Sequence, residues 1–161
     1  MPAIREKKHR LPDENYWGTR RVSFTACIDR RKRAFTRREI VETFVEILGK
    51  WTTAKHCSVP IYCFMPDHLH LIIAGLSADS RPKEAMDEFK QTTSQWFVEN
   101  APQFHWQKDY SDHIIRISDD WRNHVRYILR NPVRGGLAEY PLAYPFLGSI
   151  GLSIEEVLSE L

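Results

Sequence analysis

Two apolar, β-rich runs separated by a short turn are the feature that most limits the fold of this chain. Residues 58–64, SVPIYCF, and 68–74, HLHLIIA, flank the residues 65–67, MPD. β-Branched and aromatic side chains favour strands, and Pro and Asp favour turns. The pattern therefore predicts two antiparallel strands that pair as a hairpin, with Pro60 near the start of the first.

Two histidines interrupt the second of these strands. Successive strand residues point to opposite faces, so His68 and His70 share one face while Leu69, Leu71 and Ile73 face the core. Two imidazoles at this spacing can bind one divalent cation. The alternative is a pair of hydrogen-bonded histidines on an open face of the sheet.

The common zinc patterns do not complete this pair. No HExxH or HxHxDH sequence is present, and Cys27, Cys57 and Cys63 are too scattered for a cysteine-rich zinc site or a disulfide framework. Any metal held by His68 and His70 would therefore need a further ligand from elsewhere in the fold and would keep an open position.

The segments around the hairpin alternate between strand and helix patterns. Residues 20–28 alternate apolar and polar, which predicts a half-buried strand. A helix follows, with Thr36 and Glu39 as a capping box. A second helix is expected over about 81–99, with Pro82 in its first turn.

The last part of the pattern adds a strand and a helix. Residues 113–118, HIIRIS, predict a fourth strand, and Ser118 is expected to cap a third helix that Pro132 and the Gly135–Gly136 pair end. The order β-α-β-β-α-β plus a helix predicts an α+β, ferredoxin-like antiparallel sheet with two helices on one face. We expect a single domain over 1–161, with a basic N-terminal arm (1–15) and a C-terminal tail (138–161), where Ser153 and Glu156 suit a short capped helix.

The third helix carries a candidate nucleophile. Trp121, Val125, Ile128 and Leu129 form its apolar stripe, and Tyr127 lies well off that stripe. Asn131 sits one turn later on nearly the same bearing. The pair suits a nucleophile beside a metal ligand, but an ordinary amphipathic tyrosine with a helix-ending asparagine explains the same pattern.

Positive charge is concentrated at the start of the chain. Residues 1–38 hold twelve Lys or Arg and four Asp or Glu, a balance of +8, while the remainder holds eleven and seventeen, a balance of −6. Clustered guanidinium groups favour phosphate backbones, although a solvated basic face is the simpler reading. The candidate DNA-binding residues are Arg20, Arg21, Arg30, Arg31, Lys32, Arg33, Arg126, Arg130 and Arg134.

Taken together, the motifs FMPDHLHLII (64–73), WQKDYSDHIIR (106–116) and YILRNPVRGGL (127–137) resemble the single-tyrosine class of HUH endonucleases. The likeness is greatest to the transposases of insertion sequences and their REP-associated tyrosine transposase branch. The resemblance implies that His68, His70 and Asn131 bind a divalent cation, Mg²⁺ or Mn²⁺, and that Tyr127 is the nucleophile. Asp67 stands where the branch tends to have Asn or Asp.

The resemblance also implies the reaction and the substrate. Such an enzyme cleaves and rejoins single-stranded DNA beside a hairpin, through a 5′-phosphotyrosine, as a monomer or a homodimer. Exposed aromatic residues such as Tyr16, Trp17 or Trp106 can stack on unpaired bases, unless they belong to the core. Two rivals remain: a non-catalytic nucleic-acid-binding module, and a metal phosphodiesterase that uses water. Tyr110 with Asp112 and His113 is a competing cluster, which we interpret as structural.

Composition indicates the compartment in which this chain is expected. No apolar run approaches the roughly 18 residues of a membrane span, and the first residues lack the apolar stretch of a secretory signal. With three scattered cysteines, a reducing cytoplasm is the expected compartment.

Overall fold

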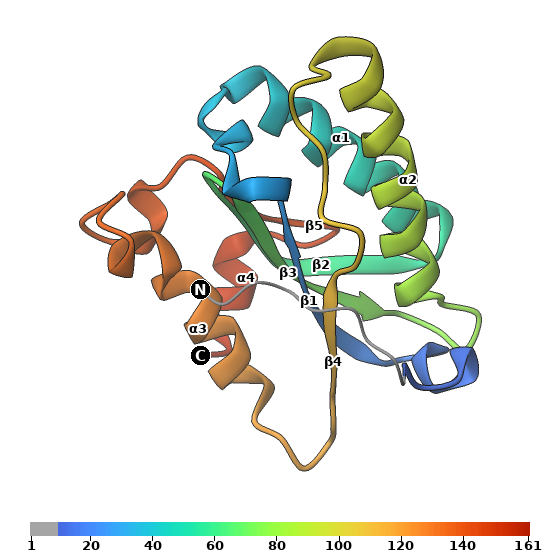
Figure 1. Cartoon of the computed structure of the whole chain (residues 1–161). Coiled ribbons are helices and arrows are strands. Elements are labelled where there is room, and N and C mark those ends of the chain that lie inside the picture. Colours follow the sequence, from blue (N-terminus) through green and yellow to red (C-terminus); the bar gives the residue numbers. More distant parts are fainter. Residues whose placement is uncertain (1–9) are drawn as a thin grey trace.

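The computed structural model describes residues 10–161 and contains a five-stranded antiparallel sheet in the order β4-β1-β3-β2-β5 (Figure 1). The four neighbouring strands β4-β1-β3-β2 have the order of a ferredoxin-like fold, so the α+β expectation is confirmed. The fifth strand extends the sheet at the β2 edge. The strands are β1 (Arg21–Cys27), β2 (Cys57–Met65), β3 (His68–Gly75), β4 (Ser111–Ile115) and β5 (Leu147–Ile150).

Helices cover both faces of the sheet. α1 (Arg38–Ala54) and α2 (Pro82–Asn100) lie on one face, and α3 (Trp121–Arg134) and α4 (Ile154–Ser159) lie on the other (Figure 1). Leu71 and Ile73 pack on the α1–α2 side, whereas Ile72 packs with Val125 and Ile128 of α3. Strand alternation thus divides the hairpin between two cores, with the histidines on the α3 side.

Three local expectations near α3 were wrong. β4 covers Ser111–Ile115 instead of 113–118, because those are the residues that pair with β1. Asp120, and not Ser118, caps α3: its carboxylate accepts a hydrogen bond from the Arg122 N–H at 3.1 Å. The helix also runs past Pro132 to Arg134, but the Gly135–Gly136 pair does end it as expected, with Gly136 at φ +72°.

The expected cap of α1 is also absent. The helix begins at Arg38, and the Thr36 hydroxyl donates to the Arg33 carbonyl at 3.1 Å instead of capping the helix. Pro82 does lie in the first turn of α2, as predicted. Pro60 lies inside β2, where the register with β3 shifts between Ser58 and Ile61, so an irregular site accommodates the missing N–H.

The C-terminal tail is part of the sheet. β5 pairs with β2, and Ser153 caps α4 by accepting from the Glu156 N–H at 3.1 Å, as the sequence predicts. Arg122 and Arg126 of α3 donate to the carbonyls of Glu160 and Leu161. Hydrogen bonds therefore hold Glu160 and Leu161 against α3.

Most of the expected N-terminal arm, residues 1–9, lies outside the described residues. The part that is described is packed: Arg10 forms an ion pair with Asp112 of β4, and Asp13–Tyr16 forms a 3-10 turn. Among the described residues, no helix combines the length and apolar character that a membrane crossing would need.

Candidate active site

His68 and His70 lie in the middle of the sheet face that α3 covers. The β1–β3 register places Thr25 opposite His70, and the β2–β3 register places Cys63 opposite the same histidine. Both histidines are buried, at 8% and 6% exposure, and their rings lie 4.9 Å apart at 86°. The predicted shared face is thus observed, but it is enclosed instead of open.

A hydrogen bond at Nδ1 orients each imidazole. His68 Nδ1 lies 2.7 Å from Asp67 Oδ1, and the other carboxylate oxygen of Asp67 accepts from Arg31 Nε at 3.0 Å. His70 Nδ1 lies 2.9 Å from the Thr25 hydroxyl. With Nδ1 engaged in both rings, the Nε2 atoms are the ones left to bind a metal, an arrangement typical of metal-ligating histidines.

Burial keeps both imidazoles neutral. It lowers the pKa of His70 to about 3, assisted by electrostatic interaction with the neighbouring His68 and with the positively charged Arg134. It also lowers the pKa of His68, although the Asp67 carboxylate opposes that shift. Burial alone would raise the pKa of Asp67, but its bonds from His68 and Arg31 outweigh burial and hold that pKa below its usual value. Neutral imidazole is the form that binds a cation.

Tyr127 projects from α3 beside this pair. Its side chain is 55% exposed, and its ring lies 6.0 Å from the His70 ring at 87°. Asn131, one turn later, is only 8% exposed, and its Nδ2 has no hydrogen-bond partner among the described residues. Both features differ from an ordinary helix shoulder, where a helix-ending asparagine would be solvated.

Arg134 joins the two α3 residues. Its guanidinium carbon lies 4.3 Å from the centre of the Tyr127 ring, and Nη2 donates to the Tyr127 carbonyl at 3.1 Å. Nη2 also donates to Asn131 Oδ1. One cation therefore lies against both the phenol and the amide, where a phosphate would need positive charge.

The donor set fits a divalent cation. Two neutral imidazoles with their Nδ1 atoms engaged are side chains arranged for a ligand rather than for a dry core. The third candidate ligand atom is Asn131 Oδ1, which accepts a hydrogen bond from Arg134 and has a second lone pair for a cation. His68, His70 and Asn131 could supply three ligands and leave positions for substrate oxygens. Imidazole with an amide oxygen suits Mn²⁺ and, with further oxygen ligands, Mg²⁺.

Comparison with known proteins identifies the family of this chain. The family described as "Transposase IS200 like" matches residues 19–131, well over half of the chain. This chain belongs to the IS200-like transposase family. The matched range contains the histidine pair, Tyr127 and Asn131.

Two curated relatives share a name. A REP-associated tyrosine transposase of Escherichia coli is 32% identical over 83 residues, covering 51% of this chain and 48% of that protein. A Haemophilus influenzae protein, provisionally given the same name, is 27% identical over 95 residues, covering 52% and 54%. The chain thus spans about half the length of the curated relatives it matches.

Solved structures share the fold. A REP-associated tyrosine transposase bound to a REP hairpin superposes with a TM-score of 0.67, at 22% identity, over 91% of this chain and 82% of that one. A Deinococcus radiodurans protein described as a transposase gives a TM-score of 0.51, at 16% identity, over 78% and 97%. At these identities the likeness establishes the fold alone.

The competing tyrosine cluster is dispersed in this transposase-family chain. Tyr110 is buried and donates from its hydroxyl to Asp87 Oδ1 at 2.5 Å, while Asp112 pairs with Arg10 and accepts from Tyr16. Strand alternation sends His113 to the opposite face, where its ring stacks on His124. Tyr110 therefore has the structural role expected of it.

The predicted DNA-binding residues do not form one group. Arg31 and Arg134 reach the histidine–tyrosine site, but Arg126 is bonded to the C-terminal residues, and Lys32 Nζ donates to the Gln103 carbonyl at 3.0 Å. Arg20 and Arg21 line a hollow of about 570 Å³ that none of the proposed catalytic residues borders. The other three predicted DNA-binding residues, Arg30, Arg33 and Arg130, are exposed.

The three candidate aromatic platforms differ in exposure. Tyr16 and Trp106 are buried, and the Trp106 indole donates to the Thr93 hydroxyl at 2.8 Å, so these two belong to the core. Trp17 is 44% exposed and stacks against Arg81, with a distance of 4.4 Å from the guanidinium carbon to the ring centre. Only Trp17 of the three stays available to a base.

Sequence reasoning missed Thr25, and it named Arg134 as a DNA-binding candidate without placing it beside Tyr127. Thr25 faces His70 because β1 pairs with β3, and nothing in the linear sequence fixes that register. Arg134 reaches Tyr127 and Asn131 because α3 continues through Pro132, where the sequence predicted an end. The sequence signal for this contact was the spacing of seven residues between Tyr127 and Arg134, which corresponds to two helical turns.

Proposed function

We propose that this chain is a single-stranded DNA endonuclease and strand transferase that acts at hairpin sites through a 5′-phosphotyrosine. The observation that carries the proposal is the position of Tyr127: exposed, on the rim of the site, with its ring against His70. Family membership supports it, and so does the hairpin named with one structural neighbour.

In the proposed reaction the Tyr127 oxygen attacks the scissile phosphorus. The phenol loses its proton, a P–O bond forms to tyrosine, and the P–O3′ bond breaks to give a protonated 3′-OH. A phenol, with a reference pKa of about 10, is a better leaving group than a sugar hydroxyl, so an incoming 3′-OH can reverse the step. The bond between phosphorus and tyrosine thus conserves the energy of the broken P–O3′ bond, so strand joining needs no other energy source.

The surrounding side chains have separate roles. A Mg²⁺ or Mn²⁺ ion held by His68, His70 and Asn131 would polarise a non-bridging phosphate oxygen. Arg134 stacks on the nucleophile and would hold a phosphate oxygen next to it. All of these side chains come from one chain, so a monomer holds a complete set.

A labelled hairpin pool tests the proposal. Hairpin oligonucleotides with randomised single-stranded flanks are incubated with the protein and Mn²⁺, and the products are separated on a denaturing protein gel. A label at the DNA 3′ end should move with the protein, whereas a 5′ label should be released on a fragment ending in 3′-OH.

Two variants make the test specific. Tyr127→Phe should form no adduct, while Tyr140→Phe, which alters another exposed tyrosine, should leave the adduct unchanged. An adduct in Tyr127→Phe would refute the assignment of the nucleophile. Cleavage without an adduct would favour the water-dependent phosphodiesterase, and binding without cleavage would favour the non-catalytic module.

A further inference from the structure

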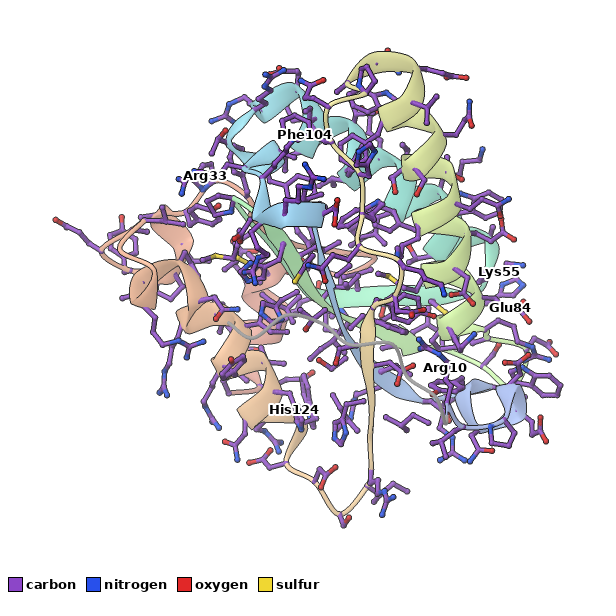
Figure 2. All side chains as sticks on the ribbon, viewed as in Figure 1. Arg10, Arg33, Lys55, Glu84, Phe104 and His124 are labelled. Carbon is purple, nitrogen blue, oxygen red and sulfur yellow. The ribbon has the colours of Figure 1, made fainter. Side chains whose placement is uncertain are left out.

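Three metal-ligating side chains meet where β4 leads into α3. His113 comes from β4, Asp119 from the connecting loop and His124 from α3, and one ligand atom of each lies within 4.8 Å of the others. Figure 2 labels His124 on α3, on the side of the helix nearest β4. None of the three is a proposed ligand of the histidine–tyrosine site.

The contacts already hold the trio close together. His113 Nε2 lies 3.6 Å from Asp119 Oδ2, and the two imidazole rings lie 5.3 Å apart at 21°. The backbone N–H of Arg116 donates to Asp119 Oδ2 at 3.1 Å, which fixes the carboxylate in the loop. His113 is exposed and the other two side chains are half-buried, so an ion from solvent can reach them.

The residue types point to a particular class of ion. Two imidazoles and one carboxylate are a three-ligand zinc set that leaves a fourth position open. Ligand atoms around a tetrahedral Zn²⁺ are about 3.3 Å apart, as bond lengths of about 2.0 Å require. Closing the trio therefore needs movements of about 1 Å, which the exposed loop 116–118 can absorb.

We propose that His113, Asp119 and His124 form a second metal site, for Zn²⁺ or a similar imidazole-preferring ion, that fastens the start of α3 to β4. Mg²⁺ is excluded from this role because it prefers oxygen ligands. His124 precedes Tyr127 by three residues, so a metal here fixes the turn from which Tyr127 projects. Binding at the trio does not depend on whether Tyr127 is a nucleophile.

Cobalt titration separates this site from the first one. Co²⁺ is added to the full chain carrying His68→Ala and His70→Ala, and its visible absorption is followed, with Zn²⁺ as competitor. One equivalent should bind in this background, Zn²⁺ should displace it and excess Mg²⁺ should not. Adding His113→Ala and His124→Ala to this background should abolish the absorption. Adding only Asp119→Asn to the same background should weaken Co²⁺ binding by at least about tenfold.

Hydrogen exchange supplies an independent measurement. In the same background, Zn²⁺ should slow amide exchange in the first two turns of α3, residues 121–127, by about tenfold or more, and it should have no such effect after His113→Ala and His124→Ala. Absence of binding in the His68→Ala, His70→Ala protein would overturn the proposal. Equal binding after removal of the trio histidines would overturn it as well.

Discussion

The ring of Tyr127 on α3 meets the ring of His70 on β3 edge to face, with centroids 6.0 Å apart. Fifty-six residues separate the two in the chain, and the packing of α3 across the sheet brings them together. The contact places an exposed side chain of the site next to a buried one, so changes to either side have distinct and measurable consequences.

Orientation of the histidines should control metal affinity. Asp67→Ala removes the acceptor that holds His68, and we expect Mn²⁺ affinity to fall by about 10- to 100-fold. Thr25→Val should act in the same direction through His70. Isothermal titration of Mn²⁺ measures both, with Asp79→Ala, in an exposed loop, as the control. Unchanged affinity in Asp67→Ala would show that His68 does not need its carboxylate to bind metal.

Arg134 should affect the chemical step more than DNA binding. Loss of a charged hydrogen bond costs about 1.5–3 kcal/mol, so Arg134→Ala should slow adduct formation at saturating DNA by about 10- to 100-fold. Arg134→Lys should recover only part of that rate, because an ammonium group lacks the planar fork.

The matched control for this prediction is Arg130→Ala. Arg130 is an exposed arginine on the same helix and should influence affinity alone. Single-turnover measurements over a range of DNA concentrations separate rate from affinity. Equal effects of the two substitutions on the rate would contradict the role given to Arg134.

Stability should fall in alkaline solution. Burial raises the pKa of Cys57 to about 11 and that of Cys63 to about 12, so both thiols stay neutral in the folded protein above pH 9 while they ionise in the unfolded chain. Their contribution is complete below about pH 9 and is lost as pH rises through 11 to 12. Each should account for about 2 kcal/mol of unfolding free energy between pH 8 and 11.

Urea unfolding at the two pH values measures this loss. Because substitution at a buried site also changes packing, the comparison is the pH-dependent difference within each protein. That difference should be smaller in Cys57→Ala and Cys63→Ala than in the unmodified chain. If the pH-dependent loss is the same in all three proteins, the thiols are not its source.

Core packing around the hairpin should dominate stability. Leu71 is fully buried on the α1–α2 side, so Leu71→Ala should lower the free energy of unfolding by about 2–5 kcal/mol. Ile117→Ala, at a fully exposed position, should change it by less than about 0.5 kcal/mol. Urea denaturation at neutral pH provides the comparison, and similar values for the two would place Leu71 outside the core.

The sequence by itself determined the hairpin, the helix patterns and the shared face of His68 and His70. Those features follow from local rules: strands alternate with period two and helices with period 3.6. The pattern also singled out Tyr127, which lies off the apolar stripe of one helix, and Asn131, which follows it by one turn. The spacing of the pair suited a nucleophile beside a metal ligand, and the resemblance to a known family implied those two roles.

Tertiary structure decided what depends on pairing and packing between distant segments. The β1–β3 register chose Thr25 as the partner of His70, and the cover of α3 turned an open face into a buried one. Tertiary structure also overrode two local signals for α3. The sequence predicted a cap at Ser118 and an end at Pro132, but Asp120 caps the helix and the helix continues through Pro132. Helix propensities differ by about 1 kcal/mol among most residues and by about 3 kcal/mol for proline, and packing across the sheet outweighs them.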